Sequence, residues 1–152
     1  RDWSSDVCSS DLVIVHFKND TKLTKNGVST YLNYWNLKQC EKREFSSCID
    51  TTAIKNYNFY TATKQAITIA NFIKKMKKQP RQYLKYTILV ITNSILIQLL
   101  DMILNLTKPC ATIYIVSSMD KANALFNTLD RNNSLEINAY LLVQEIKYIS
   151  PN

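Results

Sequence analysis

Glycine is almost absent from this chain, because Gly27 is the only one among 152 residues. Loops that cradle phosphate groups need several glycines, since only a residue without Cβ lets the backbone approach the phosphate closely. The sequence therefore excludes a glycine-rich phosphate-binding loop. It also contains a single histidine, His16, which excludes a metal site built from several histidines.

Paired cysteines are lacking as well. Cys40, Cys48 and Cys110 have neither the spacing of zinc ligands nor that of a disulfide framework, and Cys8 lies in an unusual N-terminal segment. No nucleophile and base occur together in a recognisable pattern. We therefore expect a protein without catalytic residues, metal or cofactor, and a reducing compartment, the cytoplasm, as its location.

Residues 2–12 read DWSSDVCSSDL and resemble the translation of a sequencing adapter. We expect residues 1–12 to be an adapter-derived artefact that stands in place of the native N-terminus. On this interpretation residues 1–11 have no ordered place in the fold, and the strand that follows lacks a partner at the edge of the sheet. Removing Arg1 and three aspartates leaves 18 basic and 9 acidic residues, so the formal charge becomes +9 in place of +7.

Strands and helices alternate along the rest of the chain. Runs of β-branched and aromatic residues predict four strands, at 13–17, 45–49, 86–91 and 111–116. Apolar residues at helical spacing predict a helix that begins after Thr21 or Thr24 and runs to about residue 39, and further helices at 60–78, 95–106 and 118–129. This order indicates an α/β domain over 13–131, with a mixed, largely parallel sheet of about four strands and helices packed on it. A C-terminal turn and amphipathic helix are expected over 132–152.

The stretch 86–106 is apolar and long enough to suggest a membrane span. It contains Asn93 and Ser94, however, and a central Asp101 alone disfavours insertion by about 2.5–3.5 kcal/mol. We therefore predict a buried strand followed by a helix, not a transmembrane segment.

The helix at 95–106 is apolar around most of its circumference, so one sheet cannot cover it. We expect its exposed part to form an interaction surface for another protein or a second copy of the chain, made of Ile95, Leu96, Leu99, Leu100 and Ile103. The alternative is a lipid or a small hydrophobic ligand, held in a pocket lined by Trp35, Tyr57 or this helix.

Basic residues cluster at the end of the helix at 60–78. Lys74, Lys75, Lys78 and Arg81 form a candidate anion-binding patch, which could meet phosphates of nucleic acid or of anionic lipid. The other interpretation is a solvated helix end. Because Lys, Asn, Ile and Tyr share AT-rich codons, we attribute much of the positive charge to codon composition and do not expect a nucleic-acid partner.

Several segments together resemble the STAS family, named for sulfate transporters and anti-sigma-factor antagonists. They are 13–17 with 21–24, 48–54, 88–90 with Ser94, 106–109 and 113–126. The resemblance is greater to small bacterial STAS-like proteins, whose fold is shared with part of the CRAL-TRIO lipid-transfer proteins.

This resemblance implies a non-enzymatic α/β domain that acts through protein contacts, sometimes with a ligand, and that has one further strand at its start. The segment that anti-sigma-factor antagonists phosphorylate is replaced here by residues 57–61, which read YNFYT. We therefore assign no regulatory residue from the family.

A third hypothesis is a receiver-like signalling domain. Asp50 ends the second predicted strand, as a phospho-acceptor does, and Asp20 could help to hold magnesium after the first strand. Lys108 and Pro109 precede the last strand in a similar place to a receiver's Lys-Pro pair. The residues after Asp50 lack the usual turn sequence of receivers.

Overall fold

The computed structural model describes residues 2–4, 11–17, 23–55, 58–131 and 133–152. These residues form one six-stranded sheet in the order β1-β2-β3-β4-β5-β6. The strands are β1 (Asp2–Ser4), β2 (Asp11–His16), β3 (Phe45–Asp50), β4 (Leu84–Val90), β5 (Thr112–Val116) and β6 (Lys147–Ile149). The helices are α1 (Lys25–Glu41), α2 (Phe59–Lys77), α3 (Ser94–Leu106), α4 (Met119–Asp130) and α5 (Ser134–Val143).

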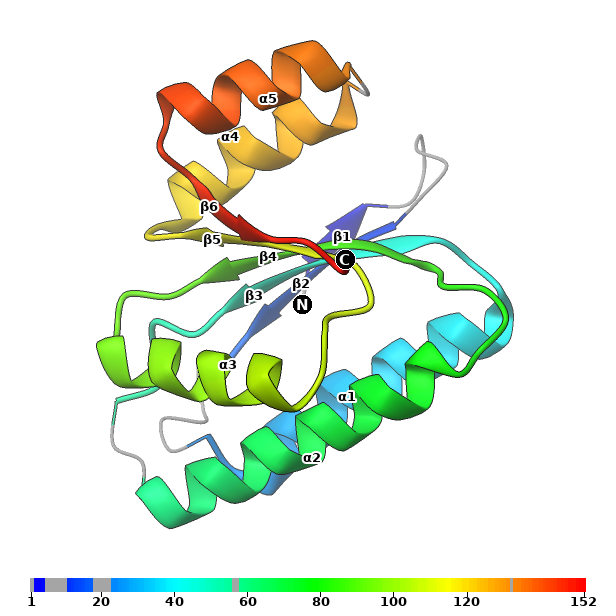
Figure 1. Ribbon diagram of the computed structural model, residues 1–152, viewed down its shortest axis with the longest axis vertical. Coiled ribbons are helices and arrows are strands. Elements are labelled where there is room, and N and C mark those ends of the chain that lie inside the picture. Colours follow the sequence, from blue (N-terminus) through cyan, green and yellow to red (C-terminus); the bar gives the residue numbers. More distant parts are fainter. Residues whose placement is uncertain (1, 5–10, 18–22, 56–57, 132) are drawn as a thin grey trace.

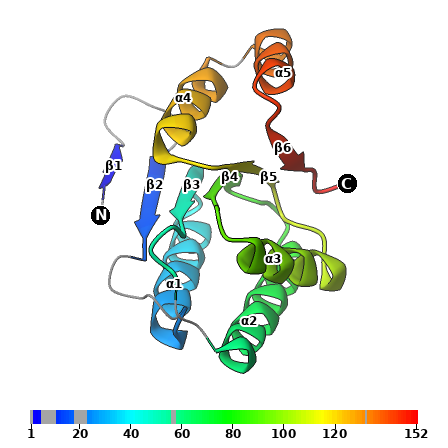
Figure 2. The same cartoon turned by 90° about the vertical axis from the view of Figure 1, so that its left-hand side faces the viewer.

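The four central strands, β2 to β5, are parallel and follow one another in sequence order. Each is joined to the next by a helix, and successive crossovers of the same hand that advance in one direction place their helices on the same face. Figures 1 and 2 show this arrangement: α1, α2 and α3 cover one face of the sheet, whereas α4 and α5 lie on the other. The expected α/β architecture with a mixed, largely parallel sheet is confirmed.

Two apolar layers enclose the central strands. Alternate side chains of β4 point to opposite faces, so Leu89 packs with α1, α2 and α3, whereas Ile88 and Val90 pack with α4 and α5. Leu84 also packs with α1, α2 and α3, because the pairing of β3 with β4 shifts register between Leu84 and Thr87. This explains why residues 86–91 read as a nearly continuous apolar run: both faces of the strand are covered. The stretch 86–106 is accordingly a strand followed by a helix.

The two ends of the sheet differ from expectation. Residues 147–149 were predicted to continue a helix, but α5 ends at Val143 and β6 pairs antiparallel with β5. The helix stops because Glu145 adopts a left-handed conformation, with φ of 53°, after which the chain returns to the sheet edge. The expectation of an amphipathic tail helix is therefore wrong for residues 147–149.

An edge partner for β2 is also present, contrary to expectation. Asp2 pairs with Ile14, Trp3 with Val13 and Ser4 with Leu12, in antiparallel register. Leu12 is itself buried against α4 and α5. Residues 1 and 5–10 lie outside the described part of the chain, and the adapter origin of the N-terminal segment stays a prediction.

Within the part of the chain that the structure describes, three turns place residues other than glycine in the left-handed region. Leu23, Lys42 and Glu145 have φ of 54°, 56° and 53°, a conformation that costs about 1–2 kcal/mol when a Cβ is present. Lys42 ends α1, and its N–H donates to the carbonyl groups of Lys38 and Gln39. A scarcity of glycine thus leaves these turns to strained residues.

The layer formed by α4 depends on Leu125, which is fully buried under this helix. We predict that Leu125→Ala lowers the free energy of unfolding by about 2–5 kcal/mol, through lost burial and a residual cavity. Urea denaturation measures this loss. The matched change Leu142→Ala, at a side chain that is 80% exposed on α5, should cost less than about 0.5 kcal/mol; equal losses would contradict the packing described.

Candidate functional site

An apolar cavity of about 170 Å³ lies between the sheet and the helices α1, α2 and α3. Its wall is almost entirely apolar, and α3 contributes Leu96, Leu99, Leu100 and Ile103 to it. The inward side chains of β3, β4 and β5 form the floor, among them Ile49, Leu89 and Ile113. The three helices and the sheet therefore build this space together.

Small side chains on α2 leave the space open. Ala62 and Ala66 line the cavity and are one turn apart, so they lie on the same face of the helix. Both are buried, as is Ala70 on the next turn, which does not line the cavity. Methyl groups at these positions do not reach across the gap between α2 and the sheet.

Trp35 on α1 forms another part of the wall and stacks edge-on against Phe72 of α2, with ring centroids 5.1 Å apart. Its Nε1 is buried without a hydrogen-bond partner in the described structure. A buried N–H without a partner is costly. The indole therefore offers one unsatisfied donor in an otherwise apolar region.

The other polar groups of the wall bond within the protein. The Tyr31 hydroxyl lies 3.0 Å from Oγ of Ser47, and burial raises the pKa of Tyr31 to about 12 despite hydrogen bonds to Ser47 and Thr87. The Thr51 hydroxyl donates to the carbonyl oxygen of Val90 over 2.7 Å. Burial raises the pKa of Cys110 to about 11, so this thiol stays protonated at neutral pH. These groups add no charge to the cavity.

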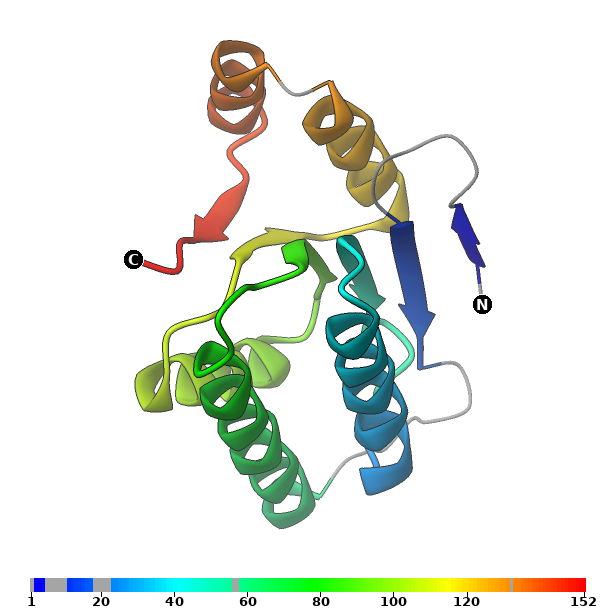
Figure 3. The same ribbon diagram turned by 90° about the vertical axis from the view of Figure 1, so that its right-hand side faces the viewer.

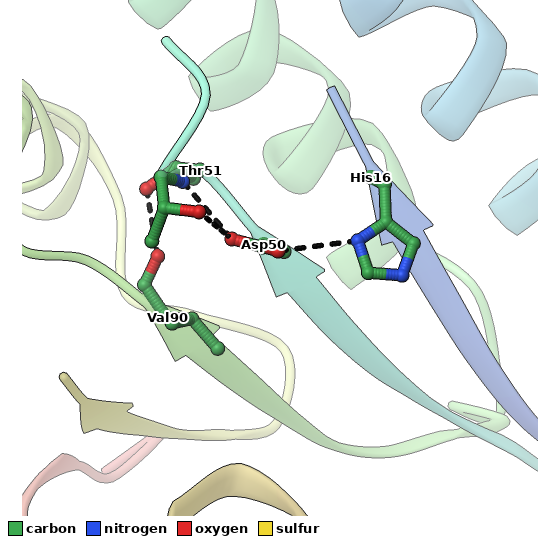
Figure 4. A network of polar contacts seen from close by, with 5 residues as sticks. His16, Asp50, Thr51 and Val90 are labelled. Carbon is green, nitrogen blue, oxygen red and sulfur yellow. Dashed lines mark hydrogen bonds and ion pairs between the residues drawn. The ribbon is translucent and has the colours of Figure 1, made fainter. Parts of the chain in front are cut away.

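A separate polar cluster lies where β2 and β3 end (Figure 4). Nδ1 of His16 is 3.1 Å from Oδ2 of Asp50, while Oδ1 of Asp50 accepts hydrogen bonds from the backbone N–H and the hydroxyl of Thr52, at 3.0 and 2.6 Å. Burial alone would raise the pKa of Asp50, but the hydrogen bonds from Thr52 and His16 outweigh it and hold this pKa below its usual value. Asp50 is thus an ionised acceptor at neutral pH.

The arrangement around Asp50 differs from that of a receiver. Receivers are doubly wound, with helices on both faces of a parallel sheet in the order 2-1-3-4-5, whereas β2 to β5 follow one another without a reversal. Both carboxylate oxygens of Asp50 are also engaged by protein groups. Asp20, the expected second acidic residue, lies outside the described residues.

Most of the predicted interaction surface on α3 is buried inside the protein. Leu96, Leu99, Leu100 and Ile103 are buried, because α2 and the sheet cover that side of α3, and only Ile95 is exposed, at 41%. Four of the five residues therefore belong to the core and line the cavity. The expectation that they form an exposed surface is wrong for this reason.

The predicted anion-binding patch is exposed as a whole. Lys74, Lys75 and Lys78 lie at the end of α2, and the guanidinium of Arg81 lies 5.0 Å from the ring centroid of Tyr83.

Of the expected pocket residues, Trp35 and the α3 helix line the cavity, whereas Tyr57 lies outside the described residues.

Two features were not predicted from the sequence. The pairing of His16 with Asp50 follows from the in-register alignment of β2 with β3, and the only available signal was that both residues end strands. The second feature is the cavity. Alanines spaced by four residues on α2 indicated a helix face with small side chains, but the size of the cavity depends on how three helices pack and could not be predicted from them.

Neither a metal site, nor a membrane-spanning helix, nor a known relative indicates the function of the described residues. Within the described residues, no three His, Cys, Asp or Glu side chains come together as metal ligands, and no helix is long and apolar enough to cross a lipid bilayer. Searches with protein-family models, among curated proteins and among solved structures found no significant match to this chain.

The Asp50 cluster makes stability depend on pH. A carboxyl whose pKa is lower in the folded state contributes stability above its unfolded pKa of about 3.9, and loses it as the pH falls through the folded value. We predict that Asp50→Asn lowers the free energy of unfolding by about 1 kcal/mol at pH 7. The difference from the unmodified chain should shrink below about pH 4 in urea denaturation series.

The matched control is Asp101→Asn on the exposed face of α3. It should change stability by less than about 0.5 kcal/mol at every pH. A loss at Asp50→Asn that is the same at neutral and acid pH would contradict a role for its charge.

Proposed function

We propose that this chain is a non-enzymatic domain that binds a small, uncharged hydrophobic molecule in the cavity between the sheet and α1, α2 and α3. The observation that carries the proposal is the apolar cavity of about 170 Å³, lined by Trp35 and by five side chains of α3. The mostly parallel α/β arrangement is compatible with the proposed STAS-like relationship.

The size of the cavity sets the size of the ligand. An engineered apolar cavity of about 150 Å³ stays dry and takes up benzene or xenon, whereas sites for larger ligands span about 300–1,000 Å³. The molecule that fits is therefore one aromatic ring or a short hydrocarbon segment. A charged ligand is disfavoured, because the wall offers no counter-charge.

Energetics favour an occupant. Side chains that border an empty apolar space lack packing partners on that side, which lowers the stability of the fold. A ligand that fills the space restores part of that loss upon binding. The thin face of α2 at Ala62 and Ala66 maintains the cavity.

Benzene serves as a probe of the cavity. We predict that it raises the thermal midpoint of the unmodified chain in a concentration-dependent way, because it binds only the folded state. Ala66→Leu should fill the space, raise the free energy of unfolding by about 1–2 kcal/mol and abolish the benzene effect. Calorimetry with and without benzene measures both changes.

The matched control uses the next turn of the same helix. Ala70 is buried but does not line the cavity, so Ala70→Leu should lower the free energy of unfolding by about 1–3 kcal/mol through overpacking. If benzene leaves the unmodified chain unchanged, or stabilises the Ala66→Leu chain equally, the proposal fails.

A second candidate function is contact with another protein through α5. Leu135, Leu142 and Val143 are largely exposed on this helix, while Leu141 packs inward. An exposed apolar group of this kind is typical of an interaction surface. The surface that was expected on α3 thus has a counterpart on α5, on the opposite face of the sheet (Figure 3).

Self-association is the simplest form of this contact. We predict that the mass measured by light scattering rises with concentration, and that Leu142→Lys with Val143→Lys keeps the chain monomeric. Asn123→Lys with Asn127→Lys adds the same charge on the exposed face of α4 and should leave association unchanged. A monomer at all concentrations would remove self-association from consideration.

A further inference from the structure

The positive charge of this protein is concentrated at one edge of the sheet. Because α1 and α2 each run back from the end of one parallel strand to the start of the next, both helices end at the edge where β3 and β4 begin. This edge is on the right in Figure 1 and faces the viewer in Figure 3. Residues 38–44 and 74–85 therefore come together although they are distant in sequence.

The charge balance of these two segments is one-sided. They hold nine basic and two acidic residues, an excess of +7 that equals the formal net charge of the whole chain. The rest of the chain is formally neutral. Segment 74–85 contains six basic residues and no acidic one.

Almost all of these cations are exposed. We call this surface the basic edge, and its exposed members are Lys42, Arg43, Lys74, Lys75, Lys77, Lys78, Arg81 and Lys85. Cations interact favourably with the dipole of a helix only within its last turn. Two or three lysines at the end of α2 would be enough for that interaction. Arg81 and Lys85 lie beyond the end of α2, so the dipole does not account for them.

Two exposed leucines lie near the ends of helices that run toward the starts of strands. Leu37 is 52% exposed near the end of α1, and Leu106 is 45% exposed at the end of α3, which also runs back toward the start of a strand. Apolar side chains among lysines suit the boundary between lipid headgroups and acyl chains. They would gain little from a polynucleotide backbone.

The identity of the cations points the same way. Lysine predominates over arginine in the basic edge, and lysine acts as a point charge that does not require a fixed partner geometry. Mobile anionic headgroups suit such charges, whereas recognition of bases relies on side-chain contacts of fixed, often bidentate geometry. The aromatic ring at this edge, Tyr83, is half-buried and is covered by Arg81, so it offers no open face for stacking.

We infer that the basic edge docks on the surface of an anionic lipid bilayer, with Leu37 and Leu106 entering the headgroup region. The contact is peripheral and electrostatic, so it weakens as salt screens the charges. Each lysine near such a surface strengthens binding about fivefold.

Co-sedimentation of the full chain with vesicles tests this inference. The chain should bind vesicles of equal parts phosphatidylcholine and phosphatidylserine, and should not bind phosphatidylcholine alone. The triple variant Lys74→Glu, Lys75→Glu, Lys78→Glu should weaken binding by at least about a hundredfold. Its matched control, Lys64→Glu, Lys121→Glu, Lys147→Glu, changes the net charge equally at exposed sites elsewhere and should weaken binding far less. Equal weakening by both triple variants would overturn a local docking surface.

A second pair of variants separates lipid from nucleic acid. Leu37→Asn with Leu106→Asn leaves the charge unchanged and should weaken vesicle binding severalfold, whereas Leu135→Asn with Leu142→Asn on α5 should not. Duplex DNA provides the competing outcome. Tighter binding to DNA than to the anionic vesicles, unaffected by the Leu37 and Leu106 changes, would overturn the inference in favour of a nucleic-acid surface. Unfolding midpoints close to that of the unmodified chain confirm that these surface variants fold.

Discussion

Burial of β4 on both faces is the constraint on which the rest of the structure depends. Its side chains alternate between two apolar layers, so neither group of helices is dispensable. The sequential order of β2 to β5 then places α1, α2 and α3 on one face. That leaves α4 and α5 to cover the other face, where α4 contacts β4 and β5 and α5 packs mainly on α4.

Local signals in the sequence were sufficient for the central fold. The four parallel strands and the helices between them were predicted within a few residues, because their apolar periodicity is long and regular. The short strands β1 and β6 were not, since three-residue edge strands depend on pairing with a neighbour rather than on their own sequence. Residues 147–149 continue an apolar pattern that also fits a helix, and the left-handed turn at Glu145 decides between the two.

The candidate site was less accessible to sequence reasoning. The apolar circumference of α3 was recognised correctly, but the same observation predicts either an exposed surface or a buried helix. The outcome depends on α2, whose alanines let α3 and the sheet share one space instead of closing it. Asp50 was recognised as a strand end, while its partner His16 became evident only from the register of β2 and β3.

The near absence of glycine has a consequence for the folded chain as a whole. Leu23, Lys42 and Glu145 hold left-handed turns that glycine would adopt without strain. At about 1–2 kcal/mol each, these turns together set the net stability several kcal/mol lower than the packed layers alone would give. The lysine that ends α1 in this way is also a member of the basic edge, so one residue carries both backbone strain and surface charge. Glycine there would relax the turn but remove the charge, which makes stability and surface electrostatics competing demands at position 42.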